Sequence, residues 1–172
     1  MRYLLIFVLL LSACAQKAPP PSNQATAFLD AVNQARSTAR KCGTQSFAAA
    51  PPLTWSLQLA QAAQAHSDYM AQTGKFGHEG IGDGTPAERV SKAGYAWRTL
   101  GENIAWGKPS STLDLQAVMQ GWLESPGHCS NLMNPAFTQL GMAYRRTAPG
   151  NNASSQSSDD RIYWTQVFAA PH

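Results

Sequence analysis

Residues 101–105 read Gly-Glu-Asn-Ile-Ala, and residues 122–128 read Trp-Leu-Glu-Ser-Pro-Gly-His. A third stretch, Phe76-Gly77-His78, lies in a segment that is rich in glycine. Taken singly, each stretch has an ordinary structural explanation, because glycine and proline mark turns and loops. The order and spacing of all three along one chain are far more specific, and they decide the fold.

The same order continues with Asn131-Leu132-Met133, Pro135 and Phe137. This series resembles the signature of the CAP superfamily, the cysteine-rich secretory, antigen 5 and pathogenesis-related proteins, also called the SCP domain. The match is to the compact bacterial branch and covers about residues 25–168. It implies an α+β fold, a three-layer α-β-α sandwich with a central, mainly antiparallel sheet. Further agreeing residues are Leu53-Thr54-Trp55, Ala62 to His66, Arg89, Gly94-Tyr95 and Tyr163-Trp164-Thr165-Gln166.

The resemblance also implies a functional site. In the family, a central cleft holds two histidines and two acidic residues, and by position His78, Glu102 and His128 match three of them. In relatives from animals and plants the fourth, a glutamate, lies three residues after the helix tryptophan, where this chain has Ser125. Glu124 lies one residue earlier, and one residue turns a helical side chain by roughly 100°. Whether Glu124 belongs to the site is therefore left open.

Two imidazoles and a carboxylate suit two kinds of chemistry. Neutral histidine nitrogens with one carboxylate form a tripod for Zn²⁺ or another divalent cation, with an open fourth position. The same groups could act as general acid and base. His78, Glu102 and His128 are thus candidate metal ligands and candidate catalytic residues. The sequence shows no serine-centred nucleophile elbow to accompany them.

Two residues near these stretches have competing explanations. His66 falls on the apolar face of an expected helix and is interpreted as a hydrogen-bonded core histidine. Trp106 directly follows the 101–105 stretch. Like most of the tryptophans it is expected to pack in the core, and lining the cleft is the alternative.

Three functions are considered, in order of preference. The first is a binding module that holds a lipid, peptide or cell-wall fragment in the His/Glu cleft, with or without a divalent metal. The second is a zinc-dependent hydrolase that acts on envelope peptides or polymers. The third is a structural, partner-binding envelope protein. The loop at residues 150–160 could be its contact surface, but disorder is the preferred interpretation of that loop. Because no nucleophile is evident and fold alone does not assign chemistry, the binding module comes first.

The N-terminus predicts export. A basic start, an apolar run over residues 4–11 and small residues before a cut site are typical of a signal peptide that is too short to span a membrane. The run ends in Leu-Ser-Ala-Cys, which resembles the bacterial lipobox with Cys14 as the lipidated residue. An ordinary secretory signal is the alternative. The predicted organisation is a signal peptide at 1–13, a lipidated cysteine and Pro-rich tether at 14–22, and one CAP domain at 23–172. The expected location is the cell envelope, at the outer membrane in a Gram-negative source.

Two cysteines remain after Cys14, and in an oxidising compartment Cys42 and Cys129 are expected to pair. The alternative is a free catalytic Cys129 beside His128, but no remote residue to orient that histidine is evident. Loss of Arg2 with the signal peptide leaves 12 basic and 10 acidic side chains, a net charge of +2 instead of +3. That balance is too small to predict a nucleic-acid partner.

Hydrophobic spacing and capping residues predict the remaining elements. Helices are expected from Ser22 to about Arg40, from Thr54 to Thr73 with Gly74 as the stop, from Thr85 to about Gly94, and from Thr112 to about Ser125. Thr85-Pro86-Ala87-Glu88 is typical of a capping box. Pro126-Gly127 is expected to end the fourth helix, and residues 131–133 to form a short turn. Strands are expected at residues 100–106, 139–146 and 161–168.

Overall fold

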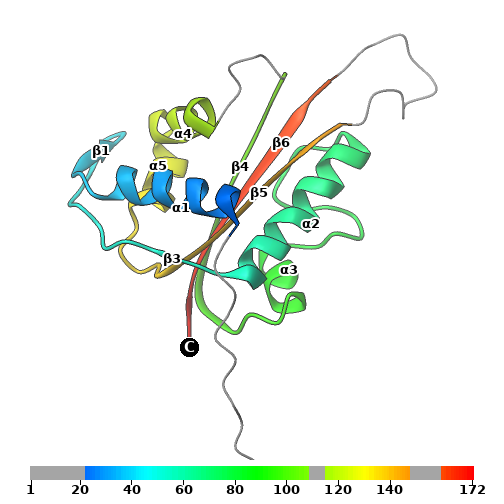
Figure 1. The fold of residues 1–172 in the computed structure, drawn as a ribbon, viewed down its shortest axis with the longest axis horizontal. Coiled ribbons are helices and arrows are strands. Elements are labelled where there is room, and N and C mark those ends of the chain that lie inside the picture. The colour runs from blue at the N-terminus through cyan, green and yellow to red at the C-terminus, as the bar shows by residue number, and fades with distance from the viewer. Residues whose placement is uncertain (1–21, 109–114, 148–159) are drawn as a thin grey trace, which may run out of the picture.

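The chain folds as a β-sheet between two layers of helices (Figure 1). The structure is a computed structural model that describes residues 22–108, 115–147 and 160–172. The expectations for residues 1–21, for Thr112 and for nearly all of the loop at 150–160 lie outside these ranges. No helix within them is long and apolar enough to cross a lipid bilayer. The expected α+β class and three-layer arrangement are confirmed.

The central sheet has four strands in the order β3-β5-β6-β4. Their bounds are β3 (Thr54–Trp55), β5 (Gln139–Arg146), β6 (Ile162–Pro171) and β4 (Trp97–Gly107). β6 pairs antiparallel with both β5 and β4, and the short β3 runs parallel to β5. The sheet is therefore mainly antiparallel, as expected, and β4 with its 101–105 stretch forms one edge.

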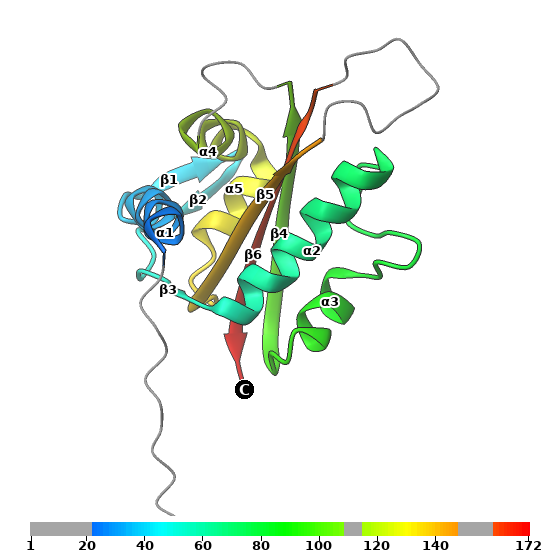
Figure 2. The ribbon, with the colours of Figure 1, turned by 45° about the vertical axis from the view of Figure 1, so that its right-hand side comes forward.

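Helices cover both faces of the sheet (Figure 2). α2 (Leu57–Thr73) and α3 (Pro86–Lys92) lie on one face, and α1 (Asn23–Arg36), α4 (Leu115–Glu124) and α5 (Pro126–Met133) lie on the other. Side chains alternate along a strand, so β6 serves both layers. Trp164 and Phe168 pack in the cluster with α1 and α4, whereas Val167 and Ala169 pack in the cluster with α2.

The ends of α2 and α3 follow local sequence. The Ser56 hydroxyl caps the start of α2, and the helix ends at Gly74 with φ 69°, a left-handed conformation that glycine adopts without strain. At the start of α3, Thr85 and Glu88 form both hydrogen bonds of the predicted capping box. These ends fix the limits of the loop at residues 74–85, which carries His78.

The first helix is shorter than predicted and is followed by an unpredicted hairpin. α1 ends at Arg36 and not near Arg40, and β1 (Arg40–Cys42) pairs with β2 (Gln45–Phe47) around Gly43. Helical spacing suggested a longer helix because Ala39 continues the apolar stripe. Tertiary contacts decide otherwise, since Cys42 forms a disulfide with Cys129 in α5. The predicted disulfide is confirmed.

The second helix also begins later than predicted. Thr54 and Trp55 do not open α2 but form β3, paired with Gln139 and Leu140 of β5. The backbone N–H of Ser56 donates to the carbonyl of Leu140, so the chain leaves the sheet directly into the helix that Ser56 caps. A parallel pairing between segments so far apart in sequence leaves no local signal.

The fourth helix ends before Pro126, as predicted, but the short separate turn predicted at residues 131–133 is wrong. α4 ends at Glu124, but Pro126 then takes the first position of α5, and residues 131–133 form the last turn of that helix. Proline is favoured at this position because its missing N–H would have no helical partner there. His128 therefore lies in the first turn of a helix.

β5 and α2 approach so closely at Gly141 that no side chain fits between them. A Cβ at this position would lie 2.1 Å from backbone atoms of Leu59 and Ala60. We expect Gly141→Ala to lower the free energy of unfolding by about 3 kcal/mol, because helix and strand must move apart. Urea unfolding measures the loss. Gly121→Ala in α4 is the control, since its Cβ meets nothing within 4 Å. Equal effects at the two positions would contradict the close packing.

Candidate functional site

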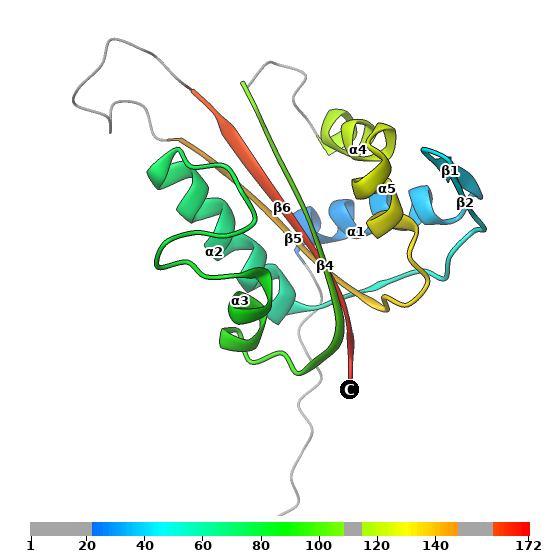
Figure 3. The same cartoon turned by 180° about the vertical axis from the view of Figure 1, so that it is seen from behind.

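β4 is the edge strand of the sheet and has a helical layer on either side (Figure 3). Three predicted site residues, His78, Glu102 and His128, lie on β4 or are hydrogen-bonded to it. Residues opposite each other in a ladder share a face of the sheet. Glu102 lies opposite Val167 and therefore faces α2, whereas Asn103 lies opposite Gln166 and faces α4 and α5. The site thus joins both helical layers across one edge of the sheet.

His78 and Glu102 form the centre of the site. The Nδ1 atom of His78 lies 2.9 Å from Oε1 of Glu102. The Glu102 side chain is 3% exposed and the His78 side chain 51%. An ionised carboxylate can only accept hydrogen bonds, so Nδ1 carries a proton and Nε2 is the ring nitrogen left for a ligand. The structure brings these two sequence-predicted residues into direct contact.

Behind Glu102 lies a set of buried ionisable side chains, His66, Asp83, Arg89 and Glu102 itself, which we name the buried charge network. Arg89 links the two carboxylates, with Nη1 2.8 Å from Oδ2 of Asp83 and Nη2 2.8 Å from Oε2 of Glu102. His66 Nδ1 lies 2.6 Å from the same Asp83 oxygen. Burying a charge is costly unless it is paired, so these contacts explain how Glu102 remains buried at the site.

His66 itself is a satisfied core histidine, as predicted. The residue is 0% exposed, and both ring nitrogens have hydrogen-bond partners, Asp83 for Nδ1 and the Gly77 carbonyl at 2.9 Å for Nε2. Its Nε2 also lies 3.9 Å from Oε1 of Glu102. The histidine is therefore part of the support of the site.

His128 reaches the site from α5, which is bonded to β4 by two asparagines. Asn103 donates to the His128 carbonyl at 3.1 Å. Asn131 donates to the Glu102 carbonyl at 3.2 Å and to the Asn103 side chain at 2.9 Å. These bonds fix α5 against the 101–105 stretch of β4. The helix that carries His128 is therefore attached to the strand that carries Glu102.

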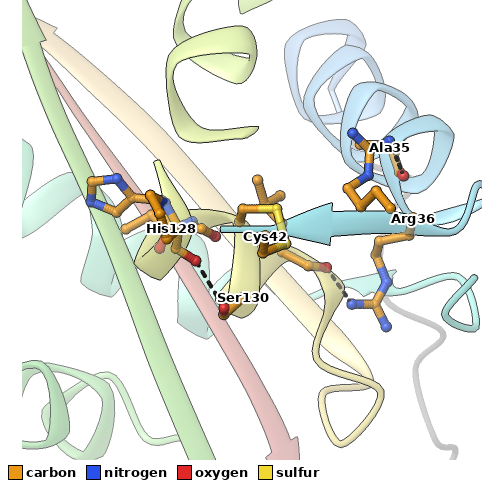
Figure 4. Close-up of a disulfide and its surroundings, with 10 residues drawn as sticks. Ala35, Arg36, Cys42, His128 and Ser130 are labelled. Atoms are coloured by element: carbon orange, nitrogen blue, oxygen red, sulfur yellow. Dashed lines mark hydrogen bonds between the residues drawn. A yellow bond between two sulfur atoms is a disulfide. The ribbon is translucent and has the colours of Figure 1, made fainter. Parts of the chain in front are cut away.

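α5 is also fixed on the side away from β4. Figure 4 shows the His128 ring pointing away from the disulfide at Cys129, with Arg36 near the far end of the helix. Arg36 Nη1 donates to the carbonyls of Leu132 at 2.7 Å and Asn134 at 3.1 Å. A cation at a helix C-terminus is favourable. Burial lowers the pKa of Arg36 to about 10, so the guanidinium stays charged at neutral pH.

The two site histidines are shifted in opposite directions. The hydrogen bond to Glu102 raises the pKa of His78 above its ordinary value, with burial opposing it. Burial lowers the pKa of His128, and the charge of His78 acts in the same direction. The two imidazoles therefore lie within electrostatic reach of each other. As pH falls, His78 takes up a proton before His128 does, which gives the pair two different roles.

The zinc tripod predicted from the sequence does not fit Glu102 as a direct ligand. Both of its carboxylate oxygens already accept hydrogen bonds, Oε1 from His78 and Oε2 from Arg89. The adjacent guanidinium also opposes a second cation at that carboxylate. Across the described ranges, no three His, Cys, Asp or Glu side chains form a group that could hold a metal ion. The divalent ion predicted at His78, Glu102 and His128 stays a prediction, with the two imidazoles as the groups left to bind it.

Glu124, the doubtful fourth residue, faces a different part of the molecule. Its side chain is exposed and accepts a hydrogen bond from Gln120 at 2.8 Å. It also lines a groove of about 730 Å³ between α1 and α4, together with Ala31 and Arg40. The structure thus does not bring Glu124 to the His78–Glu102 pair.

Trp106 is the exposed member among the tryptophans, so the expectation that it packs in the core is wrong. Its side chain shares the Glu102 face of β4, and the residue is 47% exposed. The ring meets the equally exposed Phe76 edge-on, with ring centroids 6.5 Å apart, and the Arg161 guanidinium lies 4.7 Å from its centroid. Phe76 belongs to the same loop as His78, two residues before it.

Sequence reasoning missed the residues that support the site. Arg89 was noted only as part of the family resemblance, and Asp83 had no signal beyond its place in a glycine-rich loop. Asn103 and Asn131 are part of the quoted motifs, yet their role in joining α5 to β4 needs the pairing of distant segments. A buried arginine has no periodicity of its own, so the sequence alone could not assign its partners.

Comparison with known proteins agrees with this geometry. A model of the CAP, or cysteine-rich secretory protein, family matches residues 29–168. The uncharacterized protein YkwD of Bacillus subtilis (strain 168) is 33% identical over 93 residues, 54% of this chain and 35% of that protein. The uncharacterized membrane protein YlbC of the same organism is 30% identical over 116 residues, 67% of this chain and 28% of that protein. The chain thus spans about a third of the length of these relatives.

Solved structures show the same fold. An extracellular protein containing a SCP domain from Bacillus anthracis is 27% identical, with a TM-score of 0.63 over 88% of this chain and 45% of that one. An outer surface protein from Borrelia burgdorferi is 20% identical, with a TM-score of 0.56 over 72% and 80% of the two chains. Venom allergen-like protein 4 from Schistosoma mansoni is 14% identical, with a TM-score of 0.56 over 88% and 90%. The last two support the fold alone.

Proposed function

The chain belongs to the CAP (cysteine-rich secretory protein) family, and we propose that it is an exported envelope protein whose site at His78, Glu102 and His128 binds a ligand. The observation that carries this proposal is the state of His78. Its Nδ1 is held by a buried carboxylate, while half of the side chain is open to solvent. An imidazole held in this way offers Nε2 in a fixed direction, which suits recognition of a polar group.

Export and lipid anchoring complete the proposal. The N-terminal stretch has the form of a signal peptide that ends in a lipobox-like Cys14, with a Pro-rich tether before the domain. The Cys42–Cys129 disulfide supports an oxidising compartment. The Bacillus anthracis relative is described as extracellular. Lipid, peptide and cell-wall fragments are the ligand classes that such a location offers, and exposed Phe76 and Trp106 would add apolar contact.

We expect His78→Ala/His128→Ala to reduce ligand capture at least about tenfold, because both polar anchors of the site are removed. The chain from Ser22, where the described fold begins, is incubated with lipid, glycan and peptide extracts of bacterial envelopes, and retained material is identified by mass spectrometry. His172→Ala is the matched control and should retain as much as the wild type. If the wild type retains no ligand above background, or if the double variant retains as much ligand as the wild type, the proposal is wrong.

Hydrolysis is the second candidate, and the opposite pKa shifts of the two histidines favour it. In this scheme Nε2 of His78 takes a proton from the water that attacks an amide or glycosidic bond, and Glu102 stabilises the imidazolium. As the C–N or C–O bond breaks, the imidazolium returns that proton to the leaving nitrogen or oxygen. A screen of peptide and cell-wall polymer libraries tests it. If His78→Ala leaves a purified activity untouched, the hydrolase candidate ends.

Calorimetric titration with Zn²⁺ decides the metal separately. Stoichiometric binding that disappears in His78→Ala/His128→Ala would support an ion held by the two imidazoles. Equal heats in both proteins would remove the metal from the proposal.

A further inference from the structure

We propose that His66 and Arg89, linked through Asp83, are positioning residues of the ligand site: they fix both the loop that carries His78 and the carboxylate that holds its ring. The inference rests on the proposed function in one respect, since it takes His78 as a group that meets the ligand. It concerns residues that do not themselves reach the ligand.

The loop at residues 74–85, all of which the structure describes, has no apolar side chain buried in the core. Apart from a single bridge between Gly80 and Gly84, these residues contain no regular pairing. Phe76 is 47% exposed and Ile81 is 88% exposed, so neither side chain is buried in the core. Something other than hydrophobic burial must therefore hold this loop in one conformation.

Hydrogen bonds from two buried side chains, His66 and Arg89, fix the loop instead. His66 Nε2 lies 2.9 Å from the carbonyl of Gly77, the residue directly before His78. Arg89 Nη2 donates to the carbonyl of His78 at 3.0 Å, and Nη1 donates to the carbonyl of Gly84 at 2.7 Å. The loop is thus bonded on both sides of residues 79–83, at Gly77–His78 and at Gly84. The side chains that bond it belong to α2 and α3.

The same arginine fixes the partner of the His78 ring. Its Nη2 atom, which holds the His78 carbonyl, also donates to Oε2 of Glu102 at 2.8 Å. The other oxygen of Glu102 accepts from His78 Nδ1. One guanidinium nitrogen therefore sets both the backbone of His78 and the carboxylate that orients its imidazole. A planar fork of donors can make these bonds together, whereas the single ammonium of lysine cannot.

Asp83 connects the two positioning residues. Its Oδ2 atom lies 2.6 Å from His66 Nδ1 and 2.8 Å from Arg89 Nη1. The loop therefore contributes its own side chain to the network that holds its carbonyls. Loss of one member is expected to release the loop and the Glu102 carboxylate together.

Arg89→Lys tests this because it keeps the charge and removes the fork. The chain from Ser22 is labelled with ¹⁵N in its histidine rings, and two-bond ¹H–¹⁵N correlations are recorded without ligand at a pH at which the His78 ring is neutral. In the wild type we expect His78 to hold one tautomer, with the proton on Nδ1. In Arg89→Lys we expect both tautomers, and amide hydrogen exchange over residues 75–84 about tenfold faster. Arg145→Lys, in an exposed pair with Asp68, is the control and should leave both readouts unchanged.

A folded Arg89→Lys protein with a single Nδ1–H tautomer and wild-type exchange in the loop would overturn the inference. If Arg89→Lys does not fold, the His78 tautomer and the amide exchange of the loop are measured in His66→Gln instead. A single Nδ1–H tautomer with wild-type exchange in that variant would likewise overturn the inference. Neither readout involves a ligand. Failure of the wild type to capture any envelope ligand would therefore count against the proposed function, while the state of His78 would still decide the positioning role.

Discussion

Removal of the disulfide by Cys42→Ala/Cys129→Ala is expected to lower the free energy of unfolding by about 4 kcal/mol. The bridge spans 87 positions, and the loss of loop-closure entropy in the unfolded chain amounts to about 4–5 kcal/mol for a loop of this length. Both cysteines are buried, 3% and 0% exposed, so alanine avoids placing a hydroxyl in their apolar surroundings. Urea unfolding of the purified variant measures the loss.

The wild type treated with a reductant is the companion measurement and should lose a similar amount. The disulfide holds α5 one residue from His128, so ligand capture by the variant should also fall even where it remains folded. An unchanged urea midpoint would show that the buried packing of β1 against α5 suffices without the covalent bond.

Arg89→Met is expected to have the second large effect, a loss of about 3–5 kcal/mol. Methionine fills much of the same volume but leaves Asp83 and Glu102 buried without their cation, with side chains 7% and 3% exposed. The carbonyls of His78 and Gly84 also lose the hydrogen bonds that Arg89 donates to them. The free energy of unfolding from urea titration is the measurement.

Arg145→Met provides the matched control, because Arg145 pairs with Asp68 at the surface with a side chain that is 55% exposed. Exposed pairs contribute less than about 1 kcal/mol, so this variant should unfold close to the wild type. Adding Glu102→Gln to Arg89→Met should restore part of the loss by removing one buried charge. Similar small losses at positions 89 and 145 would show that the buried charge network does not hold the loop.

Local sequence accounts for much of the helical framework. Ser56, Gly74 and the Thr85–Glu88 capping box mark helix ends through hydrogen bonds that form within a few residues. β5 was predicted at its observed bounds, residues 139–146. The errors fall where distant segments compete with local preference, as at the hairpin around Gly43 and at β3.

The candidate site was likewise predicted in part from the sequence and decided in part by tertiary contacts. His78, Glu102 and His128 were identified from motif resemblance, and the structure places His78 on Glu102. The bond that occupies Oε2 of Glu102 comes from Arg89 and joins α3 to β4, which the sequence did not indicate. The sequence did not determine whether Glu124 faces the site, because that depends on which way the side chain points from the last turn of α4. In the structure Glu124 faces the groove between α1 and α4.

The sequence by itself determined the family, the three-layer α+β class, the disulfide partners and the three candidate site residues, since motif order, capping residues and cysteine number are properties of the chain alone. The tertiary structure decided which groups surround those residues. It placed His66, Asp83 and Arg89 behind Glu102, turned Pro126-Gly127 into the start of α5, and brought Gly141 against α2. Buried charge pairs and close backbone approaches depend on segments that meet only when the sheet and its two helical layers are assembled.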